Sequence, residues 1–233
     1  MRRLFYVPIL HTAADLGTLA PGVEEHAIAV SGSSARQKQA EVVGLYWREI
    51  ATYWQGQTVA GLKIFQDGMP VAGPVGAQIV KSLAQSGSIN HLIIEHLLEN
   101  GAILMKTEDP APLKEEYFLT RELAQKKPLL GTIQALLRYR WRKGQLLRAR
   151  DSYIIKRINE GLQEGDTGVC FLGAAHRVVA GLAKDIRVIA LKDPAKVRRY
   201  SQNLTSRRRE AEVNKLGYYL TAPITRQRGE VYG

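Results

Sequence analysis

The amino-acid sequence predicts an α/β fold with a mainly parallel central sheet of about five strands, flanked by helices. Short apolar runs alternate with stretches of helical periodicity, which is the pattern of right-handed βαβ units. A length of 233 residues with 45% apolar content is enough for the core of one such domain. We therefore expect a single domain over residues 1–222 and a flexible tail over 223–233.

Five apolar runs are the predicted strands, at residues 4–10, 62–65, 102–105, 167–173 and 186–191. Polar residues follow each of them. Because ligands bind at the carboxyl ends of the strands in such sheets, four groups are expected to gather at one edge: His11, Asp67, Glu108 or Asp109, and His176. An acid in this position can equally be a turn former or a helix cap.

The predicted helices follow from apolar spacing and from capping residues. Ser33 or Ser34 caps the first, which runs to about Gln55. Its Tyr and Trp residues would suit either a dimer surface, and hence a homo-oligomer, or the core. The later helices are expected at 75–86, 89–100, 113–126, 129–162 (with a break near Gly144 left open) and 194–216. The long connection 12–34 has the length of a lid or a ligand-binding loop.

Charge is distributed unevenly along the chain. Residues 1–116 contain 9 Lys/Arg and 12 Asp/Glu, whereas the remainder contains 24 Lys/Arg and 10 Asp/Glu. Such a basic half can bind nucleic acid or another anion, but no nucleic-acid-binding signature accompanies it. A solvated basic face explains it more simply, so nucleic acid is not the favoured partner.

No membrane span is predicted, because no run of 18 apolar residues occurs. The N-terminal run lacks the long apolar region and cleavage site of a signal peptide. The single cysteine, Cys170, lies within an apolar strand and fits a reducing compartment, where we expect it to be a buried filler. The sequence thus favours a cytoplasmic protein.

Asp151 has an unusual position for an acid. It falls between Leu147 and Ile154 on the apolar stripe of its helix. A buried carboxylate is costly unless it is paired or coordinates something, so Asp151 is either half of a structural ion pair or a site residue. Its potential partners are Arg148 and Arg150 in sequence and His176 in space.

His176 stands at a strand end after small residues and could act as a general base, proton relay or metal ligand. His11 has a similar place after the first strand. No His-Glu-x-x-His, Cys-x-x-Cys, phosphate-loop or Gly-x-Ser-x-Gly motif occurs. The remaining option is a site of His and carboxylates from separate strands, suited to metal-assisted or acid/base hydrolysis.

One segment resembles a known family. Arg150-Asp151, a helix, an apolar strand ending in Gly173-Ala-Ala-His176, and a strand ending at Lys192-Asp193 are similar to the C-terminal half of TraB-like proteins. Those are grouped with TIKI metalloproteases, ChaN-like haem-binding proteins and erythromycin esterases. The resemblance covers mainly residues 145–193, and Pro8 replaces the glycine expected before His11. It implies a shared α/β scaffold with His and acidic residues at one edge.

Two hypotheses follow. The first is a hydrolase of a small or peptide-like substrate, with His11, Asp151 and His176 as catalytic residues and Asp67, Glu108 and Arg150 binding substrate. A divalent metal ion would be its cofactor, and His11, His176 and Asp151 are the expected ligands. The alternative is a non-catalytic protein that binds an anionic ligand or nucleic acid.

Overall fold

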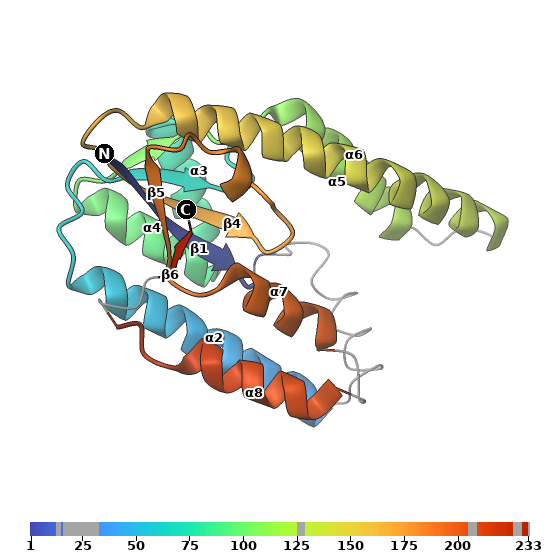
Figure 1. The fold of residues 1–233 in the computed structure, drawn as a ribbon. Coiled ribbons are helices and arrows are strands. Elements are labelled where there is room, and N and C mark those ends of the chain that lie inside the picture. The colour runs from blue at the N-terminus through green and yellow to red at the C-terminus, as the bar shows by residue number, and fades with distance from the viewer. Residues whose placement is uncertain (13–14, 16–32, 125–128, 205–208, 226–229, 233) are drawn as a thin grey trace.

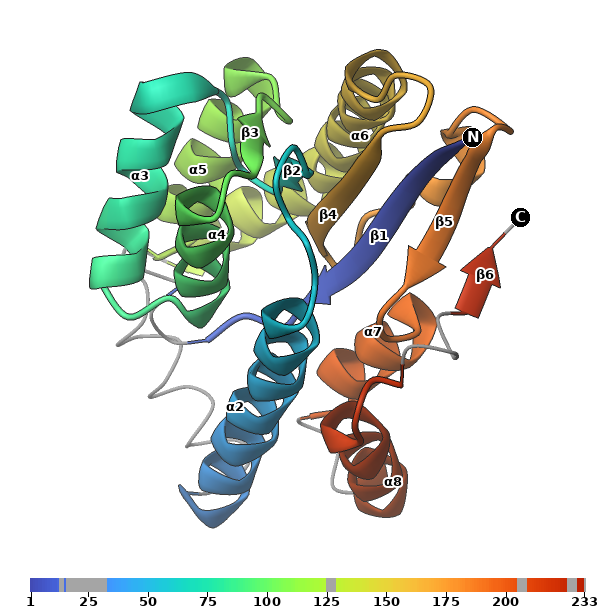
Figure 2. The same ribbon diagram turned by 90° about the vertical axis from the view of Figure 1, so that its left-hand side faces the viewer.

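The computed structural model describes residues 1–12, 15, 33–124, 129–204, 209–225 and 230–232. Within these ranges a six-stranded sheet forms, in the order β3-β2-β4-β1-β5-β6 (Figures 1 and 2). Five of the strands are parallel, and β6 pairs antiparallel with β5. The predicted α/β class with its mainly parallel sheet is therefore confirmed. The strands are β1 (Arg2–Ile9), β2 (Lys63–Gln66), β3 (Ile103–Met105), β4 (Thr167–Gly173), β5 (Ile186–Ala190) and β6 (Glu230–Tyr232).

The helices cover both faces of the sheet (Figure 2). Those in the described residues are α2 (Ser33–Gln55), α3 (Gly73–Gln85), α4 (Ile89–Glu99), α5 (Pro110–Ala124), α6 (Leu129–Gly161), α7 (Pro194–Asn203) and α8 (Glu210–Thr221), with a 3-10 turn, η2 (Val179–Gly181). Alternation along the strands creates two cores. One lies under α2, α3, α4, α7 and α8, and the other lies under α6.

The second core shows how the sequence orients α6. Ile154 and Ile158 are fully buried, in the same core as Leu4 and Cys170 of neighbouring strands. Their four-residue spacing places both side chains on the same stripe as Asp151. Packing of this stripe thus carries Asp151 to the sheet surface.

The connections after β2 and β4 leave these neighbouring strands in opposite directions. The chain passes from β2 through α3 and α4 to β3 on one side, and from β4 through η2 to β5 on the other. A crevice at the carboxyl ends of two such strands is the usual ligand site of open α/β sheets. The order of the strands therefore predicts a ligand site at the carboxyl ends of β2 and β4, which we call the β2–β4 edge.

The aromatic residues of α2 belong to the core. Tyr46 and Trp47 are fully buried, and Trp54 is nearly so. Of the two readings of this helix, core packing is the one that the structure supports.

One predicted helix is wrong in extent. The expected helix 194–216 consists of two, α7 and α8, which end and begin on either side of residues 204–209. Both contribute to the core beside α2, with Val197 and Tyr200 from α7 and Leu216 from α8. A single straight helix could not bring all three side chains to this core.

The structure can be compared with the predictions for the long helix, the C-terminal tail and the connection 12–34. The helix at 129–161 continues through Gly144 without a break. Residues 230–232, in the segment predicted as a flexible tail, form β6. Most of the connection 12–34 lies outside the described residues. No helix in the described ranges has the length and apolarity needed to cross a membrane.

Candidate functional site

Five polar side chains converge at the β2–β4 edge, and we call them the polar cluster: Asp67, Glu108, Arg150, Asp151 and His176. Asp67 directly follows β2, and Glu108 lies in the loop after β3. The backbone N–H of Glu108 donates to Met69 O at 3.0 Å, so that the two loops are joined. Arg150 and Asp151 come from α6.

A tight turn brings His176 back over its own strand. Its backbone N–H donates to Gly173 O at 3.0 Å, and Gly173 itself donates to Asp67 Oδ2 at 2.9 Å. A Cβ at Gly173 would lie 2.9 Å from the same carboxylate oxygen and 3.6 Å from the His176 ring. Only glycine leaves room for this approach.

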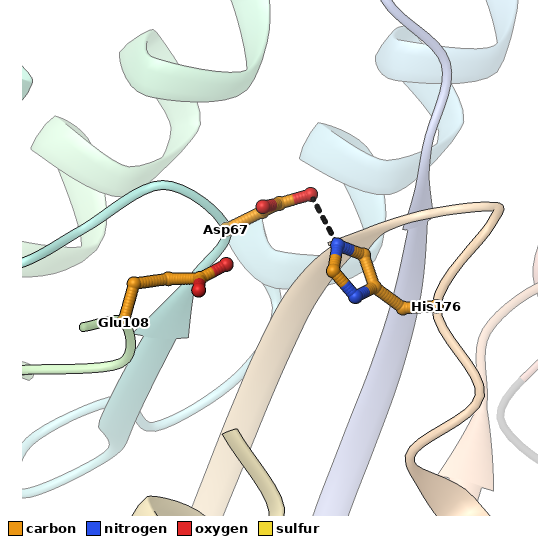
Figure 3. A group of neighbouring side chains, drawn as sticks. All are labelled: Asp67, Glu108 and His176. Atoms are coloured by element: carbon orange, nitrogen blue, oxygen red, sulfur yellow. Dashed lines mark ion pairs between the residues drawn. The ribbon is translucent and has the colours of Figure 1, made fainter. Parts of the chain in front are cut away.

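His176 is held between two aspartates. Its Nδ1 lies 2.6 Å from Asp151 Oδ1, and its Nε2 lies 3.3 Å from Asp67 Oδ2, the contact drawn in Figure 3. Asp151 Oδ2 also accepts a hydrogen bond of 3.1 Å from the backbone N–H of Arg177. Asp151 therefore fixes both the ring and the backbone that follows it.

Arg150 joins three carboxylates. It donates to Asp67 Oδ1 at 2.5 Å, to Glu108 Oε1 at 2.7 Å and to Glu116 Oε2 at 2.5 Å. Its side chain is 10% exposed and that of Glu108 is wholly buried. The guanidinium fork is the group suited to several planar contacts of this kind.

The pKa values of these groups reflect burial and charge. Burial opposes protonation of His176, but hydrogen bonds to Asp151 and Asp67 outweigh it and raise its pKa to about 9. Burial also opposes ionisation of Asp67, yet the pKa of that carboxyl falls well below its usual range because of His176 and Arg150. Burial raises the pKa of Glu108, against the effect of Arg150. Without a further ligand, His176 is thus an imidazolium at neutral pH.

Three members of the polar cluster could hold a metal ion. One donor atom each from Asp67, Glu108 and His176 lies within 4.8 Å of the other two (Figure 3). Two ligands about 2.1 Å from one ion lie at most about 4.2 Å apart, so only a small contraction is needed. The carboxylate on the opposite ring nitrogen, Asp151, completes the carboxylate–histidine arrangement found behind metal ligands.

This set differs from the ligands expected from sequence. Asp151 occupies Nδ1 of His176 and lies outside the three-residue group. His11 is exposed and is also outside it. Its Nε2 would nevertheless lie 3.9 Å from a Cβ at Gly173, so His11 borders the site.

The choice between Glu108 and Asp109 is settled by geometry. Asp109 accepts a hydrogen bond of 2.9 Å from the backbone N–H of Ala111 at the start of α5, which is the helix-cap role. Glu108 reaches the polar cluster instead. Sequence reasoning missed Glu116, because a glutamate on an exposed helix gives no signal of a partner 34 residues away.

A cavity of about 280 Å³ adjoins His176. It lies between the segment 176–180, the end of β5 and the start of α7, and Tyr6 contributes to its lining. No pattern in the sequence selects Tyr6, which is an ordinary residue of a buried strand.

Two groups of basic residues in the described part of the chain bear on anion binding. Arg177 and Arg198 line this cavity at the edge of the sheet. The residues 138–143 lie on the half of α6 that projects beyond the sheet with α5 (Figure 1). Cys170 is buried in β4, and burial raises the pKa of its thiol, as a filler role requires.

Comparison with known proteins gives no significant match among protein-family models, curated proteins or solved structures.

Proposed function

We propose that this protein is a hydrolase of a small or peptide-like substrate, and that the polar cluster binds a divalent metal ion. The observation that carries the proposal is the convergence of Asp67, Glu108 and His176 at a sheet edge where α/β proteins bind ligands. The resemblance to TraB-like proteins supports it at the level of the scaffold only.

Each residue has a distinct part in the proposal. Asp67, Glu108 and His176 hold the ion, which would supply Lewis-acid activation of water or of a carbonyl group. One imidazole and two carboxylates suit Zn²⁺, Mn²⁺ or Fe²⁺. Asp151 keeps the proton of His176 on Nδ1, so that the lone pair of Nε2 is available to bind the ion.

Arg150 is a positioning residue in this scheme. Its contacts keep Asp67 and Glu108 facing each other while it lowers the repulsion between them. Loading an ion next to a guanidinium requires Arg150 to yield part of its contact with Glu108, where its Nε bonds are already long, at 3.2 and 3.3 Å.

The proposal also includes a role for His11 and a cellular compartment. His11, exposed at the border of the site, is placed to exchange protons with solvent as a general base. A free buried thiol and the absence of any disulfide partner for the single Cys170 fit a cytoplasmic enzyme.

Metal binding is tested first on protein stripped with a chelator. Calorimetric titration with Zn²⁺ and with Mn²⁺ is expected to show one site in the original chain. Asp67→Asn and His176→Gln should each weaken it by about 10- to 100-fold or more. The control is His96→Gln, because His96 is an exposed imidazole on α4. Equal affinity in all four proteins would contradict the proposed ligand set.

Hydrolysis is tested with 4-nitrophenyl esters and peptide anilides of varied acyl group. The metal-loaded protein should hydrolyse at least one of them, and Asp67→Asn should lower kcat/KM by about 100-fold or more. Turnover that is unchanged in both Asp67→Asn and His176→Gln would show that the activity comes from another site or a contaminant.

A second candidate is an anion-binding protein without turnover. The observation in its favour is the pair Arg177 and Arg198 at the cavity beside His176. It predicts binding that weakens with salt, whereas binding to nucleic acid through residues 138–143 would show a much steeper salt slope.

A further inference from the structure

The cavity beside His176 contains a polar group without a partner. The Tyr6 side chain is 1% exposed and lines the cavity, and its hydroxyl has no hydrogen-bond partner among the described residues. A buried hydroxyl of this kind is satisfied by water or by a ligand. The part of the cavity at Tyr6 is therefore suited to an atom that accepts a hydrogen bond.

Two arginine side chains place positive charge at the same cavity. Arg177 is exposed, and among the described residues its guanidinium has no hydrogen-bond or ion-pair partner. Arg198 donates from Nε to Ala174 O at 2.5 Å and from Nη2 to His176 O at 3.2 Å, so its other N–H groups are left for a ligand.

The one carboxylate in the lining does not cancel this charge. Asp193 caps α7 by accepting from the backbone N–H of Ala195 at 2.7 Å. Its other oxygen lies 3.6 Å from Lys196 Nζ. The cavity thus offers two guanidinium groups and one phenol to an anion, against an acid that already has its partners.

The remaining wall is apolar. Val178, Val188 and Ala190 are buried and line the cavity. Its volume of about 280 Å³ falls just below the roughly 300–1,000 Å³ of sites for drug-sized ligands. The occupant must therefore be small, with a short apolar body.

We propose that this cavity binds a short aliphatic carboxylate, or the corresponding acyl group of an ester or amide. The carboxylate or carbonyl oxygens accept from the Tyr6 hydroxyl and from Arg177 and Arg198. The aliphatic chain lies against Val178, Val188 and Ala190.

The inference deepens the proposed function, and its acyl part rests on it. His176 belongs both to the polar cluster and to the cavity wall, so an acyl group bound in the cavity lies beside a proposed ligand of the hydrolytic centre. Addition of water there releases an alcohol or amine and leaves the short carboxylic acid in the cavity. The substrate class is then esters or amides of short aliphatic acids, with the free acid as a competitive inhibitor.

The test compares three probes by titration of ¹⁵N-labelled protein. Isovalerate has both charge and chain, 3-methylbutan-1-ol has the chain alone, and acetate has the charge with almost no chain. Isovalerate should shift the backbone amides of residues 176–180 and 193–198, with an affinity about tenfold or more above that of either other probe. Equal affinities, or shifts confined to other residues, would overturn the inference.

Variants make the test specific. Arg177→Ala, at an exposed side chain, should weaken isovalerate binding by about tenfold, and Ala190→Leu should block it by filling the cavity. Arg187→Ala, at an exposed arginine of β5 outside the cavity lining, is the matched control and should bind as the original chain does. Unchanged binding in Arg177→Ala and Ala190→Leu would contradict the assignment.

The two proposals fail separately. Isovalerate bound in the cavity of a protein that hydrolyses no ester would leave the cavity assignment standing and remove the hydrolase. Hydrolysis that isovalerate does not inhibit, in a protein whose cavity amides do not shift, would remove the cavity assignment alone.

Discussion

Helix α6 has two halves that use the same residue types to different ends. Arg142 and Arg150 lie two turns apart, and each forms an ion pair with a glutamate of α5, Glu115 or Glu116 at 2.5 Å. The Arg142 side chain is 36% exposed, on the half that projects from the sheet, whereas that of Arg150 is 10% exposed and also contacts Asp67 and Glu108. The two ion pairs have the same chemistry, but only that of Arg150 is buried. Burial therefore predicts a structural role for Arg150 and little contribution from Arg142.

The apolar residues of the two halves differ in the same way. Ile154 and Ile158 are fully buried, whereas Leu137 and Trp141 are 63% and 70% exposed. The half over the sheet gains stability from burial and can position charged groups, while the projecting half packs against α5 (Figure 1). What distinguishes the site from the projecting half is therefore the burial of its charges.

The largest effect is expected for Arg150→Met. It leaves the buried carboxylate of Glu108 unpaired, and loss of one partner from a buried ion pair costs about 3–5 kcal/mol. The measurement is the free energy of unfolding in urea. Arg142→Met is the control, and its denaturation midpoint should not change measurably, because exposed ion pairs contribute little. Similar losses in both variants would show that burial does not separate the two halves.

The next effect is the pH dependence of the metal-free protein. The pKa of His176 is raised to about 9 from 6.5, so its stabilising contribution is complete below pH 6.5 and is lost as the pH rises through 9. The expected loss is up to about 3 kcal/mol.

Lys192 acts in the opposite direction over part of this range. Burial lowers its pKa to about 8, so its effect on stability becomes more favourable as the pH rises from 8 to 10.5. The quantity to measure is therefore the difference in unfolding free energy between the original chain and His176→Gln at pH 6 and at pH 9. A difference that does not shrink toward pH 9 would contradict the raised pKa.

A smaller effect is expected for Gly173→Ala. The new Cβ would lie 2.9 Å from Asp67 Oδ2, and relief of that overlap should cost about 1–3 kcal/mol while it displaces Asp67 from His176. Metal affinity, measured by calorimetry, should fall with stability. A variant with the original affinity would show that Asp67 need not lie where the structure places it.

The smallest effect, and the only gain, is expected for Gly144→Ala on the projecting half. A Cβ there meets only Arg148 Nη1, at 3.7 Å, and replacement of a helical glycine by alanine stabilises by about 0.5–1 kcal/mol. Thermal unfolding would show a slightly raised Tm. A lowered Tm would indicate that α6 needs glycine at this position.

Local pattern was enough to predict most of the fold. Apolar runs and polar strand ends predicted the parallel sheet, and the four-residue spacing around Asp151 predicted its burial. The division of the last helix was missed because residues 204–209 contain no glycine or proline, the residues that most often signal the end of a helix.

The site was predictable in its members and not in its pairings. Asp67, Glu108 and His176 could be selected because they follow strands, and Asp151 because it lies on an apolar stripe. Arg150 was selected as its neighbour in the segment that resembles TraB-like proteins. The pairing of Arg150 with Glu116 depends on how far α6 is shifted along the sheet. The same shift decides that the two ring nitrogens of His176 contact different aspartates, Asp151 and Asp67. That shift is set by side-chain packing across the fold, which no local pattern records.

The most direct test of the account is the protonation of His176 with and without metal. In ¹⁵N NMR spectra of histidine-labelled protein near pH 7, His176 without metal should be a doubly protonated imidazolium, held by Asp67 and Asp151. Addition of Zn²⁺ should remove the proton from Nε2 alone and leave Nδ1 protonated toward Asp151. An imidazolium that persists at saturating Zn²⁺ would contradict a metal-binding role for the polar cluster, and a ring that is already neutral without Zn²⁺ would contradict the raised pKa of His176.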